Sequence, residues 1–412
     1  MSMTKLFIED LSLSGKRVLM RVDFNVPVKN GVVESDKRIR AALPTIRYAL
    51  DQGASVVLMS HLGRPNGARV EKYTLAPVAT RLAELLGRPV QFLNDCVGAE
   101  VEGAVAKLQA GEVALLENVR FHIEEEGKAK DADGNSVKAD PAKVEAFRAS
   151  LSRLGDVFIN DAFGTAHRAH SSVVGVNLPR ASGYLLKKEL EFLGDAVNQP
   201  VRPLVAIIGG SKISGKIDVI QALLPKVDKL IIGGGMAFTF LKAKGYEVGQ
   251  SLCENDRVEL ARELMQAAGD KLELPSDTMV TKKLDFDART LDGLVQVASN
   301  AIPADQEGVD IGEATRARYA EIIRSAKTVL WNGPMGVFEI DASSAGTFAV
   351  AHALVDATAN GAITVVGGGD SVAAVEKAGL EDKVTHVSTG GGASLEFLEG
   401  KALPGVEALS DK

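Results

Sequence analysis

Polar and basic residues recur directly after short apolar runs in the first half of the chain. In an open parallel sheet, ligands bind outside the carboxyl ends of the strands, so these residues are expected to converge at one edge. Guanidinium groups bind carboxylates and phosphates in a bidentate manner. The sequence therefore predicts a pocket for a small anion that carries both groups. Its candidate residues are Asp23, Phe24, Asn25, His61, Leu62, Gly63, Arg64, Arg120, His167 and Arg168, and Arg38 is expected to join them from a loop.

Taken singly, each of these residues is more often a helix cap or one half of a surface ion pair. Their recurrence after four expected strands favours a shared site instead. His167 and His170 have a spacing that a metal ion could use, but no carboxylate or thiol lies near them in the sequence. A metal site at this pair is therefore not expected.

Glycine loops follow nearly every apolar run in the second half, at 209–216, 233–235, 333–336, 367–369 and 390–392. Glycine permits the close backbone approach that phosphates need. The loops at 367–370 and 390–392 lead into helical patterns, whose N-termini present free N–H groups and a partial positive charge. Lys212 and Lys216 lie four residues apart in the first loop and are expected to face phosphates. This half therefore predicts a nucleotide site.

Two familiar motifs are only partly matched. Gly210, Gly215 and Lys216 fit a Walker A loop, but Ile217 stands where that motif needs Ser or Thr, which disfavours a P-loop enzyme. The residues 369–373 resemble the nucleophile elbow of a serine hydrolase centred on Ser371. Asp382 and His386 follow in hydrolase order, but the intervening helix leaves little room for a triad. A hydrolase stays open as a rival hypothesis.

Other rival functions differ in what they require. A nicotinamide dehydrogenase needs G-x-G-x-x-G after its first strand, and the chain has no such unit. A noncatalytic nucleotide-binding protein would bind ADP without turnover. At Asp370, the pattern fits a helix N-cap and a metal ligand equally well, and Glu339 is by default a solvated acid.

The elements that position these residues are short β-branched runs alternating with helical patterns. The expected strands are 17–22, 56–60, 113–117 and 156–160, then 204–208, 229–232, 328–331, 363–366 and 385–387. A chain of 412 residues exceeds what one core usually serves. We therefore expect an α/β protein with two doubly wound, Rossmann-like parallel-sheet domains. A hinge helix at 182–197 is expected to join them, and 124–143 is expected to be a solvated loop that leads into a helix.

Composition excludes several classes of protein. A net charge of −7 argues against nonspecific nucleic-acid binding, and no apolar run approaches the ~18 residues of a membrane span. The two cysteines, Cys96 and Cys253, lie far apart and fit a reducing compartment. Residues 1–10 lack a signal segment, so we expect a cytoplasmic protein with no membrane or nucleic-acid partner.

Motifs along the whole chain carry a family resemblance. They are Arg21-Val-Asp-Phe-Asn-Val-Pro27, Ser60-His-Leu-Gly-Arg-Pro65, Glu117-Asn-Val-Arg-Phe121, residues 160–170, Gly209-Gly-Ser-Lys-Ile-Ser-Gly-Lys216, Trp331-Asn-Gly-Pro-Met-Gly-Val-Phe-Glu339, Gly367-Gly-Gly-Asp-Ser371 and Ser388-Thr-Gly-Gly-Gly-Ala-Ser394. In this order they resemble the phosphoglycerate kinases, of the bacterial type. Two departures are mild: Ser371 stands where the family often has Thr, and the loop 128–140 is longer than in many bacterial relatives.

The resemblance implies reversible phosphoryl transfer between 1,3-bisphosphoglycerate and ADP, giving 3-phosphoglycerate and ATP, with Mg²⁺ and by a monomer. It implies a phosphoglycerate domain at 1–183 plus 396–412, a nucleotide domain at 184–395, and closure about the hinge. Arg38, Lys212, Gly391 and Gly392 would surround the transferring phosphate, and the anion pocket would bind phosphoglycerate. The nucleotide contacts implied are Lys212, Lys216, Gly233, Gly234, Gly308, Asn332, Glu339, Gly368, Gly369, Asp370 and Ser371, with Asp370 also serving the metal. Because an acyl phosphate is a good donor, the protein need only align and neutralise.

Overall fold

The computed structural model describes residues 4–412 and divides the chain into two compact units. The first unit runs to Glu191 and includes Ala402–Lys412, and the second unit is Phe192–Lys401. The division after Glu191 falls inside helix α7 (Tyr184–Asn198), near the predicted hinge helix. The functional domain limits expected at 183/184 and 395/396 stay a prediction.

A six-stranded sheet forms the middle of the first unit, in the order β10-β9-β1-β4-β6-β5. Every pairing in it is parallel. Arg21, the last residue of β1, lies opposite Met59 on β4 and Asn160 on β9. The residues that follow these three strands therefore start at one edge of the sheet. The bounds are β1 Arg17–Arg21, β4 Ser55–Met59, β5 Val90–Phe92, β6 Val113–Leu115, β9 Val157–Asn160 and β10 Arg180–Ser182.

Helices cover both faces of this sheet because its strands are apolar on both sides. Val18 and Met20 belong to a core with α1 (Lys37–Asp51) and α2 (Ala76–Leu86). Leu19, between them, belongs to a separate core with α3 (Ala99–Ala106) and α5 (Pro141–Ser152). Alternate side chains of a strand point to opposite faces, so the sheet is doubly wound, as the sequence predicted.

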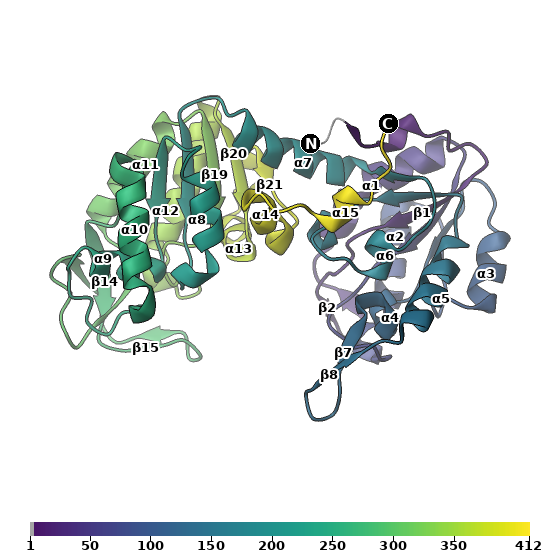
Figure 1. Cartoon of the computed structure of the whole chain (residues 1–412), viewed down its shortest axis with the longest axis horizontal. Helices are drawn as coiled ribbons and strands as arrows, with labels where there is room; N and C mark the ends of the chain where they lie inside the picture. The colour runs from purple at the N-terminus through teal and green to yellow at the C-terminus, as the bar shows by residue number, and fades with distance from the viewer. Residues whose placement is uncertain (1–3) are drawn as a thin grey trace. The chain divides into compact units, whose positions relative to one another are not determined.

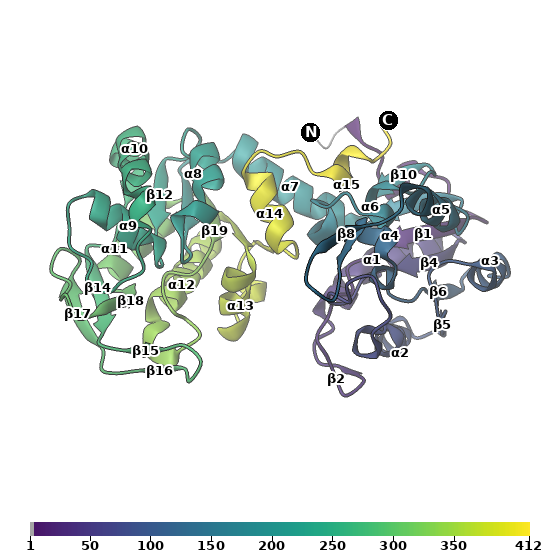
Figure 2. The same ribbon diagram turned by 60° about the horizontal axis from the view of Figure 1, so that its bottom comes forward.

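The second unit repeats this architecture with a parallel sheet in the order β13-β12-β11-β19-β20-β21. Figures 1 and 2 show helices on both sides of it. One face packs on α11 (Glu313–Ser325), α12 (Ala345–Ala359) and α13 (Gly369–Lys377). Buried residues of α8 (Ile217–Leu223), α9 (Met236–Ala243), α10 (Val258–Ala268) and α14 (Gly391–Leu398) complete the unit. The strands are β11 Leu204–Ile208, β12 Lys229–Ile232, β13 Leu272–Glu273, β19 Thr328–Asn332, β20 Ile363–Gly367 and β21 His386–Val387.

Several antiparallel elements were not predicted. The second unit carries a three-stranded sheet of β17 (Val295–Ala298), β14 (Asp277–Thr281) and β18 (Glu307–Ile311). Three small hairpins are also present: β2 (Val28–Lys29) with β3 (Val32–Val33), β7 (Lys128–Lys130) with β8 (Ser136–Lys138), and β15 (Leu284–Asp285) with β16 (Thr290–Leu291).

The expectation of a solvated loop at 124–143 was wrong in part. This segment holds the end of α4 (Ile123–Glu126), the β7–β8 hairpin and the start of α5, and Glu125 is buried. The charge pattern suggested solvent exposure, but a buried hydroxyl and a buried arginine provide partners for Glu125, as described below.

The two ends of the described chain lie together on the first unit. The Leu6 N–H donates to the Ser410 carbonyl at 2.8 Å, and Lys5 pairs with Asp411. Figure 1 shows the final yellow segment, with α15 (Pro404–Glu407), on this unit. No helix among residues 4–412 is long and apolar enough to cross a membrane.

Candidate active site

Arg38 is held at the sheet edge of the first unit by Asp23. Its Nη1 donates to both carboxylate oxygens of Asp23, at 3.0 and 3.1 Å, and to the Asn25 carbonyl at 3.2 Å. Contrary to the loop position expected from sequence, Arg38 lies in the first turn of α1, which begins at Lys37. No hydrogen bond of its Nε or Nη2 to residues 4–412 is found, so these nitrogens can serve a ligand.

His61 has its tautomer fixed by a buried arginine. Arg21 Nη2 lies 3.2 Å from His61 Nδ1, and an arginine N–H can only donate. His61 Nδ1 is therefore the acceptor, and the ring proton belongs on Nε2. Burial, together with Arg21, Arg120 and Arg38, lowers the pKa of His61 well below its ordinary value. His61 is thus a neutral imidazole with one N–H to offer.

Arg21 is held in place by a chain of buried hydrogen bonds that runs through Ser172 to Glu125. Arg21 Nε donates to Ser172 Oγ at 2.8 Å, and the Ser172 hydroxyl and N–H donate to Glu125 at 2.5 and 2.9 Å. Burial raises the pKa of Glu125, whereas Arg21 and the Ser172 bonds lower it. Sequence reasoning missed Glu125, although an acidic residue near several arginines was a usable signal.

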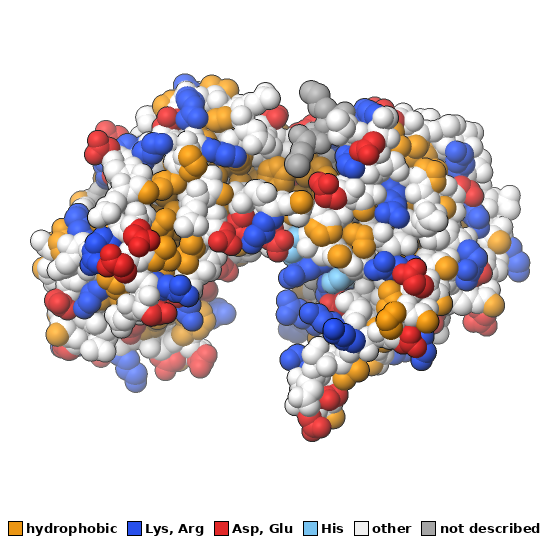
Figure 3. Space-filling view, viewed as in Figure 1, with side chains coloured by type: hydrophobic (Ala, Val, Ile, Leu, Met, Phe, Trp, Pro, Cys, Tyr) orange, Lys and Arg blue, Asp and Glu red, His pale blue; other side chains and the backbone are white. Residues whose placement is uncertain are grey.

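Two further guanidinium groups have no counter-ion within residues 4–412. Arg64 and Arg168 are exposed, and neither guanidinium makes a hydrogen bond or ion pair within that range. Arg120 donates to the Gly63 carbonyl at 3.0 Å, while its buried Nε has no hydrogen-bond partner among the described residues. Figure 3 shows blue Lys and Arg side chains beside a pale-blue histidine on this unit, above the β7–β8 hairpin.

His170 lies near the same charges. Burial, followed by the influence of Arg120 and Arg21, lowers the pKa of His170 to about 3, so its ring is neutral at pH 7. His167 is half-buried and contributes to the same effect. The neighbouring arginines disfavour a cation here, and the expectation that His167 and His170 hold no metal stays a prediction.

The other predicted residues of this pocket, among them Phe24, Leu62 and Gly63, act mainly through their backbone groups and not through their side chains. Phe24 and Leu62 are buried in the core, so their side chains do not face solvent. Gly63 N–H donates to Asn25 Oδ1 at 2.9 Å, which ties two of the loops together. A Cβ at Gly63 would lie 2.3 Å from the ring of Tyr73. Glycine at this position therefore lets the loop lie flat on Tyr73.

The glycine loops of the second unit pack backbone against backbone. A Cβ at Gly209 would lie 2.1 Å from the Pro334 carbonyl oxygen, and one at Gly333 2.1 Å from the Gly209 carbonyl oxygen. A Cβ at Gly234 would lie 2.6 Å from the Gly210 carbonyl oxygen, and one at Gly233 would meet the Met335 side chain. These loops follow β11, β12 and β19, three adjacent strands, so their glycines meet at one sheet edge.

The half-buried Lys216 and the buried Asn332 form a polar pair beside these loops. Lys216 Nζ donates to Asn332 Oδ1, while Asn332 Nδ2 is buried and has no hydrogen-bond partner among residues 4–412. Burial lowers the pKa of Lys216, and Asp370 opposes that shift. A buried N–H without a partner is costly unless a ligand or water satisfies it. The pair is therefore arranged to donate to an acceptor such as a phosphate oxygen.

Two helix N-termini open at the same edge. Gly368 is the N-cap of α13, so Asp370 is its second residue. The N-cap interpretation of Asp370 was therefore wrong, and its exposed carboxylate is available to a cation. Gly390 caps α14, which places Gly391 and Gly392 among its first N–H donors. Lys212 is exposed, and its ammonium group has no hydrogen bond or ion pair within the described chain.

A cavity of about 360 Å³ lies between these loops and the small antiparallel sheet. Gly234, Gly308, Glu339 and Asp370 line it, as does Gly235. Its volume and mostly apolar lining suit a drug-sized ligand with one flat ring. Sequence reasoning missed its apolar wall, because Phe238, Leu252, Leu284 and Phe286 come from separate elements with no shared motif.

The hydroxyl of Ser371 makes hydrogen bonds to backbone groups both as donor and as acceptor. Its hydroxyl donates to the Gly367 carbonyl at 2.5 Å and accepts from the Gly333 N–H at 2.9 Å, and the side chain is fully buried. A nucleophile needs its oxygen exposed and next to a base. This geometry does not support the serine-hydrolase hypothesis.

Comparison with known proteins decides the family. The family model described as phosphoglycerate kinase matches residues 8–401. The chain belongs to the phosphoglycerate kinase family. It is 56% identical over 414 residues to "Phosphoglycerate kinase 1" of Homo sapiens, covering 99% of both chains, and equally identical over the same coverage to that of Rattus norvegicus.

Solved structures agree with this assignment. The phosphoglycerate kinase from Coxiella burnetii matches with a TM-score of 0.83 at 41% identity, over 98% of each chain. The phosphoglycerate kinase from Pyrococcus horikoshii OT3 matches with a TM-score of 0.81 at 34% identity, also over 98% of each chain. The two-sheet α/β fold predicted from sequence is confirmed, while the bacterial type stays a prediction.

The reaction follows from membership of the phosphoglycerate kinase family. The protein is a phosphotransferase with a carboxyl group as acceptor, and it interconverts 1,3-bisphosphoglycerate plus ADP with 3-phosphoglycerate plus ATP, a reaction of glycolysis. Its nucleotide substrate is the Mg²⁺ complex, and its ligands are small molecules. The rival hypotheses of a hydrolase and of a noncatalytic nucleotide-binding protein are not supported.

Proposed function

We propose that the anion pocket of the first unit binds phosphoglycerate through its arginines. The observation that carries this proposal is that Arg64 and Arg168 lack any counter-ion within residues 4–412. Arg38 Nε and Nη2 make no hydrogen bond in that range, and Arg120 Nε has no hydrogen bond there, only a long ion pair with Glu126 at 3.9 Å. The unpaired guanidinium groups of Arg64 and Arg168, with the free N–H groups of Arg38 and Arg120, favour a dianionic phosphate and a carboxylate. His61 adds a neutral Nε2–H donor for an oxygen of the substrate.

In this proposal, Asp23 and Asn25 act mainly by positioning. The Asp23 carboxylate accepts from Arg38, and Asn25 accepts from Gly63. A free carboxylate would repel the substrate, but this one is neutralised by Arg38. Asp23 and Asn25 therefore orient the cationic groups, and each keeps acceptor capacity for a hydroxyl of phosphoglycerate.

The second unit is proposed to bind the nucleotide in the cavity of about 360 Å³. The base would lie against the apolar wall near Gly308, and Glu339 would accept from ribose hydroxyls. The phosphates would approach Lys216, Asn332 Nδ2 and the N-termini of α13 and α14. Each of these groups is a donor, which matches the acceptor-only chemistry of a polyphosphate.

Asp370 is proposed as the protein ligand of the magnesium ion. Its carboxylate is exposed at the second residue of α13 and lines the cavity. Magnesium is usually held by one or two carboxylates together with substrate phosphates, so a single acid at this place fits. When bound, Mg²⁺ neutralises charge that develops on the phosphate oxygens.

Transfer itself is proposed to be in line and to need no base. Arg38 from the first unit, with Lys212 and the N–H groups of Gly391 and Gly392 from the second, would surround the migrating phosphoryl group. Reacting atoms must come within about 3–3.5 Å of each other, so we propose that the two units close about α7 once both substrates are bound. Small-angle scattering should show compaction with both ligands; an unchanged radius of gyration would contradict closure.

The test of the whole proposal is a coupled assay with 3-phosphoglycerate and MgATP. We expect turnover that requires both substrates and Mg²⁺. Asp370→Ala should need a higher Mg²⁺ concentration for half-maximal activity. Failure of 3-phosphoglycerate to bind in the first unit would overturn the assignment of the anion pocket. We further propose that the protein is a monomer, which analytical ultracentrifugation at assay concentrations tests. We also propose that it acts in the cytoplasm, which cell fractionation tests.

A further inference from the structure

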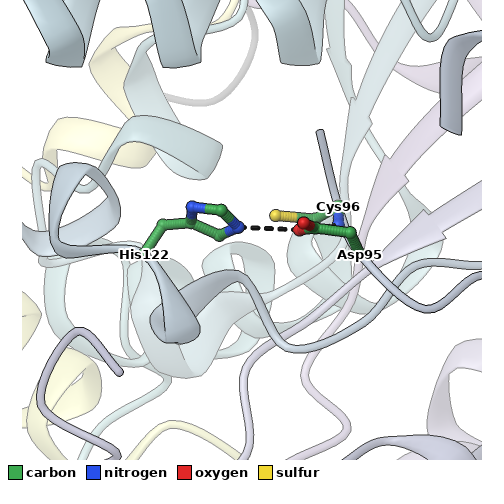
Figure 4. A group of neighbouring side chains, drawn as sticks. All are labelled: Asp95, Cys96 and His122. Atoms are coloured by element: carbon green, nitrogen blue, oxygen red, sulfur yellow. Dashed lines mark hydrogen bonds and ion pairs between the residues drawn. The ribbon is translucent and has the colours of Figure 1, made fainter. Parts of the chain in front are cut away.

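Three side chains of different donor type meet on the first unit, outside both proposed substrate sites. Asp95 and Cys96 follow β5, and His122 follows β6 and a short 3-10 turn. Since β5 and β6 are paired in parallel, the segments that leave them are neighbours at the same edge. Figure 4 shows the Asp95 carboxylate and the Cys96 sulfur both directed toward the ring of His122.

The geometry of this cluster is compact. One donor atom from each residue lies within 4.8 Å of the other two. His122 Nε2 is 2.7 Å from Asp95 Oδ1. Cys96 is fully buried, whereas the side chains of His122 and Asp95 are 29% and 50% exposed. The sulfur of the cluster is therefore shielded from solvent, whereas the imidazole and the carboxylate are partly accessible to it.

The hydrogen bond between His122 and Asp95 is a sufficient structural interaction for those two residues. It does not require the thiol. A sulfur at this position instead gives the cluster the nitrogen, sulfur and oxygen donors that a borderline-soft ion prefers. Magnesium, the ion of the nucleotide substrate, prefers oxygen ligands, so the two sites would select different metals.

We propose that Asp95, Cys96 and His122 form a binding site for Zn²⁺ or a similar divalent transition-metal ion. Binding forms one bond each to the Cys96 sulfur, His122 Nε2 and an Asp95 carboxylate oxygen. The thiol proton leaves to solvent, and the Nε2 proton that His122 donates to Asp95 moves to Nδ1 or to solvent, so that Nε2 is free to bind the ion. A tetrahedral ion with three protein ligands keeps its fourth position for water, which the exposed side of the cluster can supply. With metal–ligand distances of about 2.0–2.3 Å, donors of such a site lie roughly 3–4 Å apart. The hydrogen bond between His122 and Asp95 is therefore replaced by two metal–ligand bonds, with the two atoms moving slightly apart while the sulfur moves closer.

The test uses Co²⁺ as a spectroscopic probe in place of Zn²⁺. The full-length protein is treated with a chelator, kept free of nucleotide and titrated with Co²⁺ under anaerobic conditions. We expect one equivalent to bind with a thiolate-to-cobalt charge-transfer absorption and the visible bands of a tetrahedral ion, and Zn²⁺ to displace it. An oxygen-ligated ion at the nucleotide site cannot give the thiolate band, so a defect at that site leaves this result unchanged.

Matched variants assign the signal. Cys96→Ser should abolish the charge-transfer band, and Cys253→Ser, which removes the chain's other cysteine, should leave it unchanged. Because Cys96 is buried, its variant is paired with His122→Gln and Asp95→Asn at partly exposed positions. Both should weaken Co²⁺ binding by at least ~10-fold, the lower end of what loss of a supporting group costs, while circular dichroism stays native.

Three results would overturn the proposal. The first is a wild-type protein that shows no thiolate band at any Co²⁺ concentration. The second is a band that survives in Cys96→Ser, and the third is an affinity for Co²⁺ that is unchanged in both His122→Gln and Asp95→Asn. In the last two cases the ion would be held elsewhere.

Discussion

The anion pocket of the first unit and the glycine loops of the second, the two proposed phosphate sites, are built by different means. The first relies on guanidinium charge carried by side chains, with Arg38 fixed by Asp23 and His61 oriented by Arg21. The second relies on main-chain N–H groups that glycines bring close together, and it adds only a few lysines. One site is built by electrostatics and the other by backbone geometry.

This difference has a structural cost in each unit. Concentrating cations in the first unit requires a buried anion, Glu125, beneath them. Bringing three loops into backbone contact in the second unit requires positions where no Cβ fits. Substitutions should therefore damage the two units in different ways. In the first unit they would leave buried cations without a counter-charge, and in the second they would introduce steric clashes between loops.

The largest expected effect is the loss of a group proposed to contact the migrating phosphate. Arg38→Ala and Lys212→Ala should each lower kcat ~10²- to 10³-fold, because each removes a donor aimed at developing charge. The coupled assay measures this with both substrates saturating. A loss below tenfold in both variants would contradict the proposed roles of the two residues.

A backbone test comes next in size. Gly333→Ala should destabilise the second unit by ~3 kcal/mol or more, since Gly333 has φ +103 and its Cβ would lie 2.1 Å from the Gly209 carbonyl oxygen. Urea unfolding measures the change. Gly215→Ala is the matched control, because nothing lies within 4 Å of its Cβ, and equal destabilisation by both variants would refute the steric argument.

The corresponding test of the first unit is Glu125→Gln. An amide cannot accept from both donors of Ser172, and the charge opposite Arg21 is lost, so we expect a destabilisation of ~3 kcal/mol. If Glu125 also positions His61 through Arg21, KM for 3-phosphoglycerate should rise while KM for MgATP stays constant. A rise in both would show a general loss of structure instead.

Each unit also contains one buried aspartate whose titration should alter stability. Burial raises the pKa of Asp161 to about 7 and that of Asp310 to about 7, from an ordinary 3.8. The folded state then holds protons that the unfolded state has released, so stability is full below pH 4 for these groups and falls as pH rises toward 7. We expect each carboxyl to account for about 2 kcal/mol between pH 5 and 7.

Asparagine variants separate these two contributions. Asp161 Oδ1 accepts from the N–H groups of Leu185 and Leu186 at 2.9 and 3.2 Å, while Asp310 accepts from Ile311 and Gly346 at 2.9 and 2.8 Å. Asp161→Asn should flatten the pH dependence of the first unit, and Asp310→Asn that of the second, in urea unfolding between pH 5 and 7. A pH slope that neither variant changes would rule these groups out.

The last prediction is that neither His61 nor His170, at the anion pocket, changes its protonation near neutral pH. The pKa of His170 is lowered to about 3, and that of His61 is also lowered well below its ordinary value, so neither ring gains a proton between pH 6 and 8. The affinity for a non-titrating analogue of phosphoglycerate should therefore stay constant over this range. Calorimetry in buffers of different ionisation enthalpy would detect a proton taken up on binding, which this geometry does not predict.

Much of the fold and of the candidate site could be predicted from the sequence because the information is local. Apolar runs that end in Gly, Arg or His mark parallel strands and the edge where a ligand binds. Nine strands were expected near their observed positions, and the arginines that follow them do reach one edge of the first unit. The antiparallel sheet that carries Gly308 was missed, since its short, half-exposed strands have no strong periodicity.

Residue types and their order along the chain thus determined the fold class and the family, and they led to the two proposed substrate sites. Only the tertiary structure decided that Arg38 begins a helix, that Gly368 rather than Asp370 caps α13, and that Glu125 is buried beneath the cations. It also brought Asp95, Cys96 and His122 together. These facts depend on burial and on contacts between distant segments, which set the free energy of a charge or a hydrogen bond and which no local pattern records.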